Sequence, residues 1–181
     1  MTILPVIFSQ PSLKAYRRAE KLRDLSVHSD FPPDQPAQQP VTFPCKRTIC
    51  CTCPHINQLT SILLPGGQIQ ITGHFTCTSG NVIYCISCRK CPGTVYIGKT
   101  ARGRRLADRL REHRLDVLHK KSDLPLAQQF NGPGHSLDDV RVAVLKSGLA
   151  KKDVRQRAEM RQIFKFQTLA PRGINRDFSL L

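Results

Sequence analysis

The sequence lacks any long apolar run, and none of its hydrophobic stretches approaches the roughly 20 residues that a membrane-spanning helix requires. The apolar run at residues 2–8 has no basic region before it and is short for a signal peptide. We therefore expect an intracellular protein without a membrane partner. Because thiols stay reduced inside the cell, the eight cysteines indicate metal binding rather than disulfide bonds.

Acidic residues are also scarce, since 13 Asp and Glu stand against 28 Lys and Arg and the formal net charge is +15. The excess is uneven: residues 1–80 hold seven basic and four acidic residues, and residues 81–181 hold 21 and nine. Such a positive field favours a polyanion as partner, so we expect nucleic acid to bind the C-terminal part. The alternative is a solvated basic face that only confers solubility.

Tryptophan is absent and there are only three tyrosines, yet two of these lie in one stretch, NVIYCISCRKCPGTVYIGKT at residues 81–100. Both ends of the stretch are rich in β-branched and aromatic residues, which favour strands. The segment RKCPG between them favours a turn, so the stretch predicts a β-hairpin. Because side chains alternate along a strand, Tyr84 and Tyr96 can share one face of the sheet.

Downstream of the hairpin, the hydrophobic pattern predicts helices over residues 104–121, 124–130 and 151–169 and a third strand over residues 139–146. This order predicts an α+β domain with a three-stranded antiparallel sheet flanked by helices. We expect an N-terminal helix opening near Ser12 and a proline-rich linker within residues 1–44. A Cys/His-rich segment follows at residues 45–80, then the domain at residues 81–176 and a tail at residues 177–181.

The two longer helices are expected to present polar groups beside their apolar faces. On the first, a core-facing stripe contains Leu106, Ala107, Leu110, Val117 and Leu118. Arg109 and His113 are spaced i and i+4, so they project together from the border of that stripe. On the later helix, Glu159 heads an otherwise apolar stripe made by Ile163, Phe166 and Ala170. A carboxylate that is part-buried there must be paired or must hold a cation.

These groups suggest the chemistry of phosphodiester hydrolysis. Arg109 would neutralise the charge that grows on a phosphate in the transition state. Glu159 would hold a hard divalent cation such as Mg²⁺. A tyrosine would take the proton of the attacking water if nearby cations lower its pKa. The complete candidate set is Tyr84, Tyr96, Lys99, Arg109, His113, Glu159 and Asn175.

The segment CKRTICCTCPH, residues 45–55, is a candidate zinc-binding segment because thiolate and imidazole are the ligands that Zn²⁺ prefers. Cys45, Cys50, Cys53 and His55 are the candidate ligands within it. The spacing is not that of a standard finger, so His74 or Cys77 could complete the site. The alternative is a set of free, buried cysteines in a poorly ordered segment.

Taken together, the motifs resemble those of the GIY-YIG nucleases. The tripeptide VIY ending at Tyr84 is followed after eleven residues by YIG starting at Tyr96, and Val82 stands where the family name has Gly. Arg109, Glu159 and Asn175 match the arginine, glutamate and asparagine of that family in order. Lys99, directly after YIG, is similar to the lysine of the excision-repair members. The resemblance covers roughly residues 81–176.

A narrower resemblance is to the nuclease domains of Penelope-like retroelements, carried by NVIYCISCRKC, LAQQFNGPGHS, TLAPRGIN and the upstream KLRDLSV and CCTCPHI. Those domains carry two cysteines and two histidines suggestive of zinc. Cys88 and Cys91 match the cysteines and His135 matches one histidine, while Gln129 stands where the other histidine is expected. Cys85, His113 or His119 could take its place, although Cys85 could equally be a buried strand residue.

The resemblance implies a metal-dependent DNA endonuclease that nicks one strand, with Mg²⁺ or Mn²⁺ at Glu159 and structural Zn²⁺. It also implies residence in the nucleus and, as a further partner, the RNA of a retroelement. Either Tyr84 or Tyr96 could be the base, because members of the family are argued both ways. The alternative is a catalytically inactive, zinc-stabilised module that binds nucleic acid. Nothing in the sequence indicates the oligomeric state.

Overall fold

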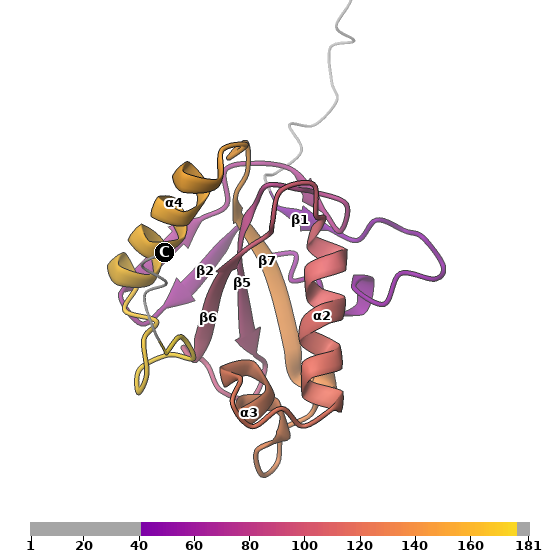
Figure 1. The fold of residues 1–181 in the computed structure, drawn as a ribbon, viewed down its shortest axis with the longest axis vertical. Helices are drawn as coiled ribbons and strands as arrows, with labels where there is room; N and C mark the ends of the chain where they lie inside the picture. The colour runs from indigo at the N-terminus through magenta and orange to yellow at the C-terminus, as the bar shows by residue number, and fades with distance from the viewer. Residues whose placement is uncertain (1–40, 177–181) are drawn as a thin grey trace, which may run out of the picture. The chain divides into compact units, whose positions relative to one another are not determined.

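The computed structural model describes residues 41–176, and these form an α+β fold (Figure 1). The central sheet has three antiparallel strands, β5 (Ile83–Cys88), β6 (Val95–Lys99) and β7 (Val140–Lys146), in the order β6-β5-β7. The predicted hairpin and third strand are therefore confirmed. The predicted N-terminal helix near Ser12 and residues 29–40 of the predicted linker lie outside the described residues, as does the tail.

The strand register places both tyrosines on one face of the sheet. Tyr84 pairs with Gly98 and Ile86 pairs with Tyr96, so Tyr84 and Tyr96 are diagonal neighbours across β5 and β6. The strands are rich in Ile, Val and Tyr, and β5 is almost wholly buried. A site built on this face therefore rests on a buried central strand.

Three α-helices occur in the described part, namely α2 (Leu106–Leu118), α3 (Pro125–Asn131) and α4 (Lys152–Lys165). Figure 1 shows α4 beside β6, α2 along the other side of the sheet, and α3 near one end of α2. All three lie within or next to their predicted ranges. The buried face of α2 differs in detail, because His113 lies within it, whereas Leu118 is 60% exposed.

The helix α4 ends earlier than predicted. Phe166 caps it, and Gln167 has a φ of +52°, a left-handed conformation that commonly terminates a helix. The buried stripe is therefore Arg155, Glu159, Ile163 and Phe166, whereas Ala170 lies beyond the helix and is exposed. Glu159 keeps its predicted place in this stripe.

Residues 41–80 form short elements that the sequence pattern did not predict. Strand β1 (Thr42–Phe43) pairs in parallel with β4 (Phe75–Thr76), and β2 (Ser61–Leu64) forms a hairpin with β3 (Gly67–Gln70). The expected linker runs to residue 44, yet Thr42 is buried and its hydroxyl accepts a hydrogen bond from the Val144 amide at 2.9 Å. The edge of β7 is thereby covered by the N-terminal part.

One continuous hydrophobic core joins the N-terminal part to the central sheet. Ile62 and Phe75 pack in the same cluster as Val82 and Ile97. This shared core holds the cysteine-rich segment in a defined position against the sheet. Within residues 41–176, no helix has the length and apolar character needed to cross a membrane.

Candidate active site and metal centres

An open cleft of about 520 Å³ lies between β6, α2, α4 and the C-terminal segment. It brings together five of the seven predicted catalytic residues, which come from four separate parts of the chain: Tyr96, Lys99, Arg109, Glu159 and Asn175. The two others, Tyr84 and His113, lie beneath the cleft and are buried. The lining also contains Asp123 and Arg176, which the sequence pattern did not single out.

Tyr84 is fully enclosed by the fold. Its side chain is 1% exposed, and its hydroxyl lies 2.7 Å from Nε2 of His113. The space for its ring exists because Gly98 stands opposite, where an added Cβ would lie 2.7 Å from the Tyr84 hydroxyl. Gly98, the glycine of the YIG tripeptide, is thus required because a side chain at this position would collide with the rings of Tyr84 and Tyr96.

Both members of the buried pair, Tyr84 and His113, are uncharged near pH 7. Burial, and then the charge of Arg109, lowers the pKa of His113 to about 3, so its imidazole is neutral near pH 7. Burial also raises the pKa of Tyr84 well above its ordinary value of 10. Tyr84 therefore keeps its proton, and its hydroxyl shares a hydrogen bond with Nε2 of the neutral His113, whose direction depends on the imidazole tautomer.

Tyr96 differs from Tyr84 in its access to solvent. Its ring lies edge-on to the ring of His113, with 5.6 Å between centroids, and its side chain is only partly buried and lines the cleft. Burial raises the pKa of Tyr96, and the charge of Arg109 acts in the opposite direction. Of the two phenols, only that of Tyr96 can meet a molecule in the cleft.

The charged groups of the cleft are held by ion pairs. Nζ of Lys99 contacts Oε2 of Glu159, with the two side chains 26% and 12% exposed. Arg109 donates to Glu112 at 2.6 Å, and Glu112 also accepts from Arg104 at 2.8 Å. Glu112 was not predicted, although its i, i+3 spacing from Arg109 on α2 was a usable signal. It fixes the guanidinium along the helix.

Asn175 lines the cleft but uses its amide to hold the fold. Its Oδ1 accepts from the Ile97 amide and from the Thr168 hydroxyl, both at 2.9 Å, and its Nδ2 donates to the Ile97 carbonyl at 2.8 Å. These bonds fasten the C-terminal segment to β6 directly beside Tyr96. Asn175 is therefore a positioning residue in this structure.

The first cysteine centre consists of Cys45, Cys50, Cys53 and Cys77, whose four sulfur atoms lie within 4.8 Å of one another. Cys53 Sγ is 3.6 Å from both Cys45 Sγ and Cys77 Sγ. Tetrahedral zinc bound by thiolates places its sulfurs about 3.8 Å apart, so the spacing fits. Cys77, which the sequence allowed as one of two completing ligands, supplies the fourth sulfur from the loop after β4.

His55, which the sequence offered as a ligand, lies outside this group of four sulfur atoms. Its Nδ1 lies 3.3 Å from the Val140 carbonyl, because the 3₁₀ turn η1 (Cys53–His55) directs the ring toward β7. Burial lowers the pKa of His55. Cys51 is also outside the centre and is exposed.

The pKa values of the thiols in the first centre are shifted in opposite directions by their surroundings. The hydrogen bond from the Arg47 backbone lowers the pKa of Cys45 to about 7, while burial raises the pKa of Cys53 and of Cys77. Four adjacent thiols cannot all ionise without a cation to offset their repulsion. The arrangement therefore suits a metal ion that is bound by deprotonated sulfur.

The second centre consists of Cys88, Cys91 and His135, whose ligand atoms lie within 4.8 Å of one another. Cys88 Sγ is 3.5 Å from Nδ1 of His135, and Cys91 Sγ is 3.6 Å from Nε2. Gln129 donates from Nε2 to Cys91 Sγ at 3.8 Å. The predicted trio is thus brought together, with Gln129 beside it.

None of the three substitutes considered for the missing histidine joins this second centre in the described residues. Cys85 pairs with Ile97 and Ala143 inside the sheet, and burial raises its pKa to about 12. His113 is engaged by Tyr84. His119 ends α2 as its C-cap.

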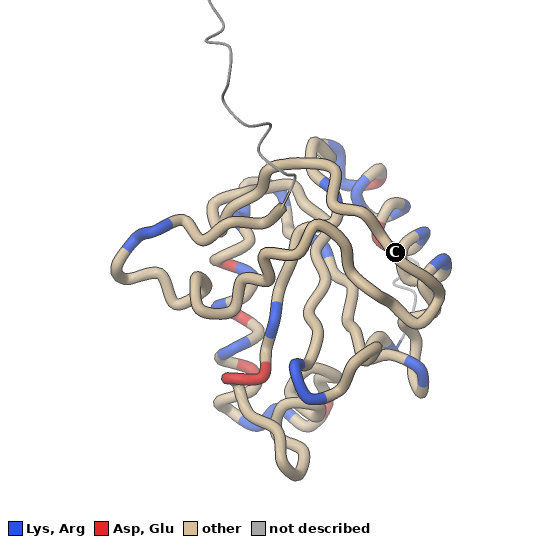
Figure 2. Tube along the Cα trace, turned by 180° about the vertical axis from the view of Figure 1, so that it is seen from behind, with Lys and Arg blue, Asp and Glu red and all other residues tan. Residues whose placement is uncertain are grey.

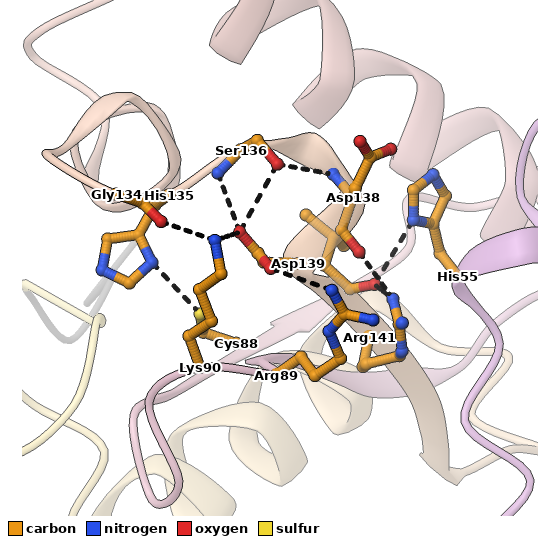
Figure 3. A network of polar contacts seen from close by, with 11 residues as sticks. His55, Cys88, Arg89, Lys90, Gly134, His135, Ser136, Asp138, Asp139 and Arg141 are labelled. Atoms are coloured by element: carbon orange, nitrogen blue, oxygen red, sulfur yellow. Dashed lines mark hydrogen bonds and ion pairs between the residues drawn. The ribbon is translucent and has the colours of Figure 1, made fainter.

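A buried carboxylate organises the second centre (Figure 3). The side chain of Asp139 is fully buried and contacts Lys90 at 3.2 Å and Arg89 at 3.6 Å. Lys90 also donates to the Gly134 carbonyl at 2.7 Å. Lys90 and Asp139 thus join the turn between the two cysteines to the loop that carries His135. Burial opposes ionisation of Asp139, but hydrogen bonds from Lys90 and the Ser136 amide outweigh it and lower its pKa.

Basic residues are distributed over several surfaces (Figure 2). Lys46 and Arg47 are exposed in the cysteine-rich segment, and further Lys and Arg positions lie along the helices. Comparison with known proteins does not assign the chain, because no family model, no curated protein and no solved structure matches it. The geometry of the cleft and of the two centres is what bears on function.

Proposed function

We propose that the chain is a divalent-metal-dependent DNA endonuclease of the GIY-YIG type, related to the nuclease domains of Penelope-like retroelements. The observation that carries this proposal is the meeting of Tyr96, Lys99, Arg109 and Glu159 in one cleft. A phenol, two cations and a carboxylate that arrive from separate elements are the groups that hydrolysis of a phosphodiester needs. The net charge of +15 supports a nucleic-acid substrate.

Each group has a role that its position allows. Glu159 would hold Mg²⁺ or Mn²⁺, which would polarise the phosphate and stabilise the leaving oxygen. Arg109, fixed by Glu112, would meet the charge that develops on the phosphate, and Lys99 would neutralise part of it. Every one of these groups lines the cleft and can reach a strand that lies in it.

Tyr96 is the proposed general base. It lines the cleft, whereas Tyr84 is buried and already bonded to His113. Burial raises the pKa of Tyr96 and the charge of Arg109 offsets only part of this effect, so a divalent ion at Glu159 would have to supply the further positive charge that favours the phenolate. Tyr84 and His113 would hold Tyr96 in place through the edge-on ring contact.

The first cysteine centre is proposed to bind structural Zn²⁺. Four thiolates from residues 45–53 and Cys77 form a closed set of ligands, as structural zinc sites do. The metal would tie the basic residues of the cysteine-rich segment to the fold. Residence in the nucleus and contact with the RNA of a retroelement follow from the proposed origin, and no membrane partner is proposed.

The test is a nicking assay on supercoiled plasmid, with Mg²⁺, with Mn²⁺ and with EDTA, alongside a DNA-binding assay. Wild-type protein should nick only with a divalent ion. Arg109→Ala should lower nicking by about 100-fold or more. The matched control is Arg111→Ala, an exposed arginine on the same helix that lies outside the cleft lining, and it should nick at nearly the wild-type rate.

A zinc-stabilised module that binds nucleic acid without cutting it is the second candidate. It is favoured by the two metal centres and by the basic residues of the cysteine-rich segment, none of which needs the cleft. Tight DNA binding without metal-dependent nicks, unchanged in Arg109→Ala, would establish this candidate and reject the nuclease. The salt dependence of binding is expected to be steep in both cases, so it does not distinguish them.

A further inference from the structure

The two metal centres differ in the number of ligands that the protein supplies. The first has four sulfur ligands, whereas the second has two sulfurs and one imidazole. Within residues 41–176, no fourth Cys, His, Asp or Glu joins Cys88, Cys91 and His135. We propose that this trio binds Zn²⁺ through three protein ligands and keeps a fourth, exchangeable coordination position that opens onto a surface groove.

The distances within the trio fit a tetrahedral zinc ion. Bond lengths of about 2.3 Å to sulfur and about 2.0 Å to nitrogen place these atoms about 3.6 Å apart. Cys88 Sγ lies 3.5 Å from Nδ1 of His135 and Cys91 Sγ lies 3.6 Å from Nε2. One of these nitrogens would bind the ion, so one of the two separations is the one that the ion would set, and the three ligand atoms lie within 4.8 Å of one another. One Zn²⁺ with two thiolates and a neutral imidazole carries no net charge, so the ion can accept another donor.

The residue beside the fourth corner is Gln129, a neutral amide. It donates an N–H to Cys91 Sγ, which is how an outer residue supports a metal-bound thiolate. An amide oxygen is a much weaker partner for Zn²⁺ than thiolate or imidazole. Gln129 therefore supports the ligand set without closing it.

The fourth position has a route to solvent. Gln129 and His135 line a depression of about 350 Å³, and this depression shares Pro125 and Arg176 with the cleft. Cys91 and His135 are themselves only partly buried. A small donor molecule can therefore approach the ion from the groove.

The trio is also held in place independently of a metal ion. Asp139 and Lys90 join the cysteine turn to the loop of His135 (Figure 3). An arrangement held by the protein can lose or exchange one ligand without the others moving apart. Catalytic zinc sites, with three protein ligands and one exchangeable water, follow the same rule. The expected external ligands are soft or borderline donors, namely thiols and imidazoles.

The test uses full-length protein loaded with Co²⁺, whose visible absorption reports its ligands. Two ions should bind per chain, one in each centre. Titration with imidazole should then shift the absorption of a single ion in a saturable manner. Gln129→His should abolish this response because it supplies a fourth protein ligand. Gln129→Ala should keep the response, and Cys88→Ser with Cys91→Ser should remove it while the four-cysteine centre stays loaded.

A second readout is the transfer of zinc to a coloured chelator. The trio should release its ion at least about tenfold faster than the four-cysteine centre, and Gln129→His should remove most of that difference. Binding of only one ion per chain, or no imidazole response in wild-type protein, would overturn the proposal. A response that appears only in Gln129→Ala would also overturn it, because the amide would then be the fourth ligand. Nicking is not measured, so these outcomes are independent of the proposed nuclease activity.

Discussion

The polar residues predicted to be catalytic divide into two groups that differ in what their polar atoms contact. The buried group makes its hydrogen bonds inside the protein and consists of Tyr84, His113 and Asn175. The cleft-facing group presents its polar atoms to an open space of about 520 Å³ and consists of Tyr96, Lys99, Arg109 and Glu159. Residues that one motif joins in sequence therefore have different physical tasks.

The difference predicts how each group responds to substitution. A buried polar group that loses its partner leaves another buried group unsatisfied, which costs free energy of folding. The cleft-facing charges pair with one another or with Glu112 beside an open cleft, where a partner left behind can meet solvent, so their loss should affect binding and chemistry more than folding. Stability and nicking should therefore separate the two groups, and each of the following experiments measures both quantities.

The largest effect is expected at Glu159. Glu159→Gln keeps the size of the side chain but removes the charge that would hold the metal ion, so nicking should fall by about 1,000-fold or more. The melting temperature should change by only a few degrees, since the side chain keeps its volume. The measurements are nicking rates and thermal unfolding. Undiminished nicking would show that Glu159 is not the metal ligand.

The next largest effect is expected at Asn175. Asn175→Ala removes three hydrogen bonds and leaves the amide and the carbonyl of Ile97 without their partner, so the free energy of unfolding should fall by about 3 kcal/mol. Urea denaturation measures this. Asn131→Ala, which removes a single bond to the Val117 carbonyl from an exposed side chain, is the control and should cost about 1 kcal/mol. Equal losses in the two variants would contradict the positioning role.

His113 should make stability depend on pH. Its pKa is about 3 in the folded protein against 6.5 in the unfolded chain, so the unfolded chain binds more protons between these values. The contribution of His113 to the free energy of unfolding is therefore fully present above pH 6.5 and falls as the pH falls toward 3, by about 3 kcal/mol at pH 4.5.

The check for His113 is urea denaturation of wild type and His113→Gln across this range. The variant should lack the part of the pH dependence that His113 causes. The exposed residue His119 provides the control, and His119→Gln should follow the wild-type profile. A parallel profile for wild type and His113→Gln would mean that His113 is not held neutral by burial.

The smallest effect is expected at Tyr84. Tyr84→Phe removes one buried hydrogen bond to His113 and should lower the free energy of unfolding by about 1 kcal/mol, with nicking within about tenfold of wild type. Tyr96→Phe should instead lower nicking by about 100-fold or more at nearly unchanged stability. The reverse result would make Tyr84 the base and would erase the distinction between the two groups.

Much of the fold could be predicted because its signals are local. Strands β5 and β6 follow from β-branched residues on both sides of a Pro-Gly turn, and the α2 helix follows from apolar residues at helical spacing. The strands of residues 41–80 could not be predicted, since they have two to four residues and show no periodicity. Their pairing depends on partners far along the chain, such as Thr42 with Val144.

Glu159 and Arg155 show, within a single helix, that local spacing predicts burial but not the distant partners of a buried side chain. The apolar spacing on α4 placed Glu159 in a buried stripe, as observed. Arg155 heads that stripe and is 2% exposed, although arginine is rarely buried. Its guanidinium donates to backbone carbonyls just before α4, including that of Ala150, and to the side chain of Asn81, which lies 74 residues earlier in the chain. No local pattern reports so distant an acceptor.

The sequence by itself determined the kinds of candidate ligand and candidate catalytic group, their order along the chain and the elements that carry them. Only the tertiary structure decided that Cys77 rather than His55 completes the first centre, that Tyr96 rather than Tyr84 faces the cleft, and that the second centre has three ligands. The physical reason is that spacing governs contacts within a turn or a helix. Contacts between distant loops and strands depend on how the shared core packs them together.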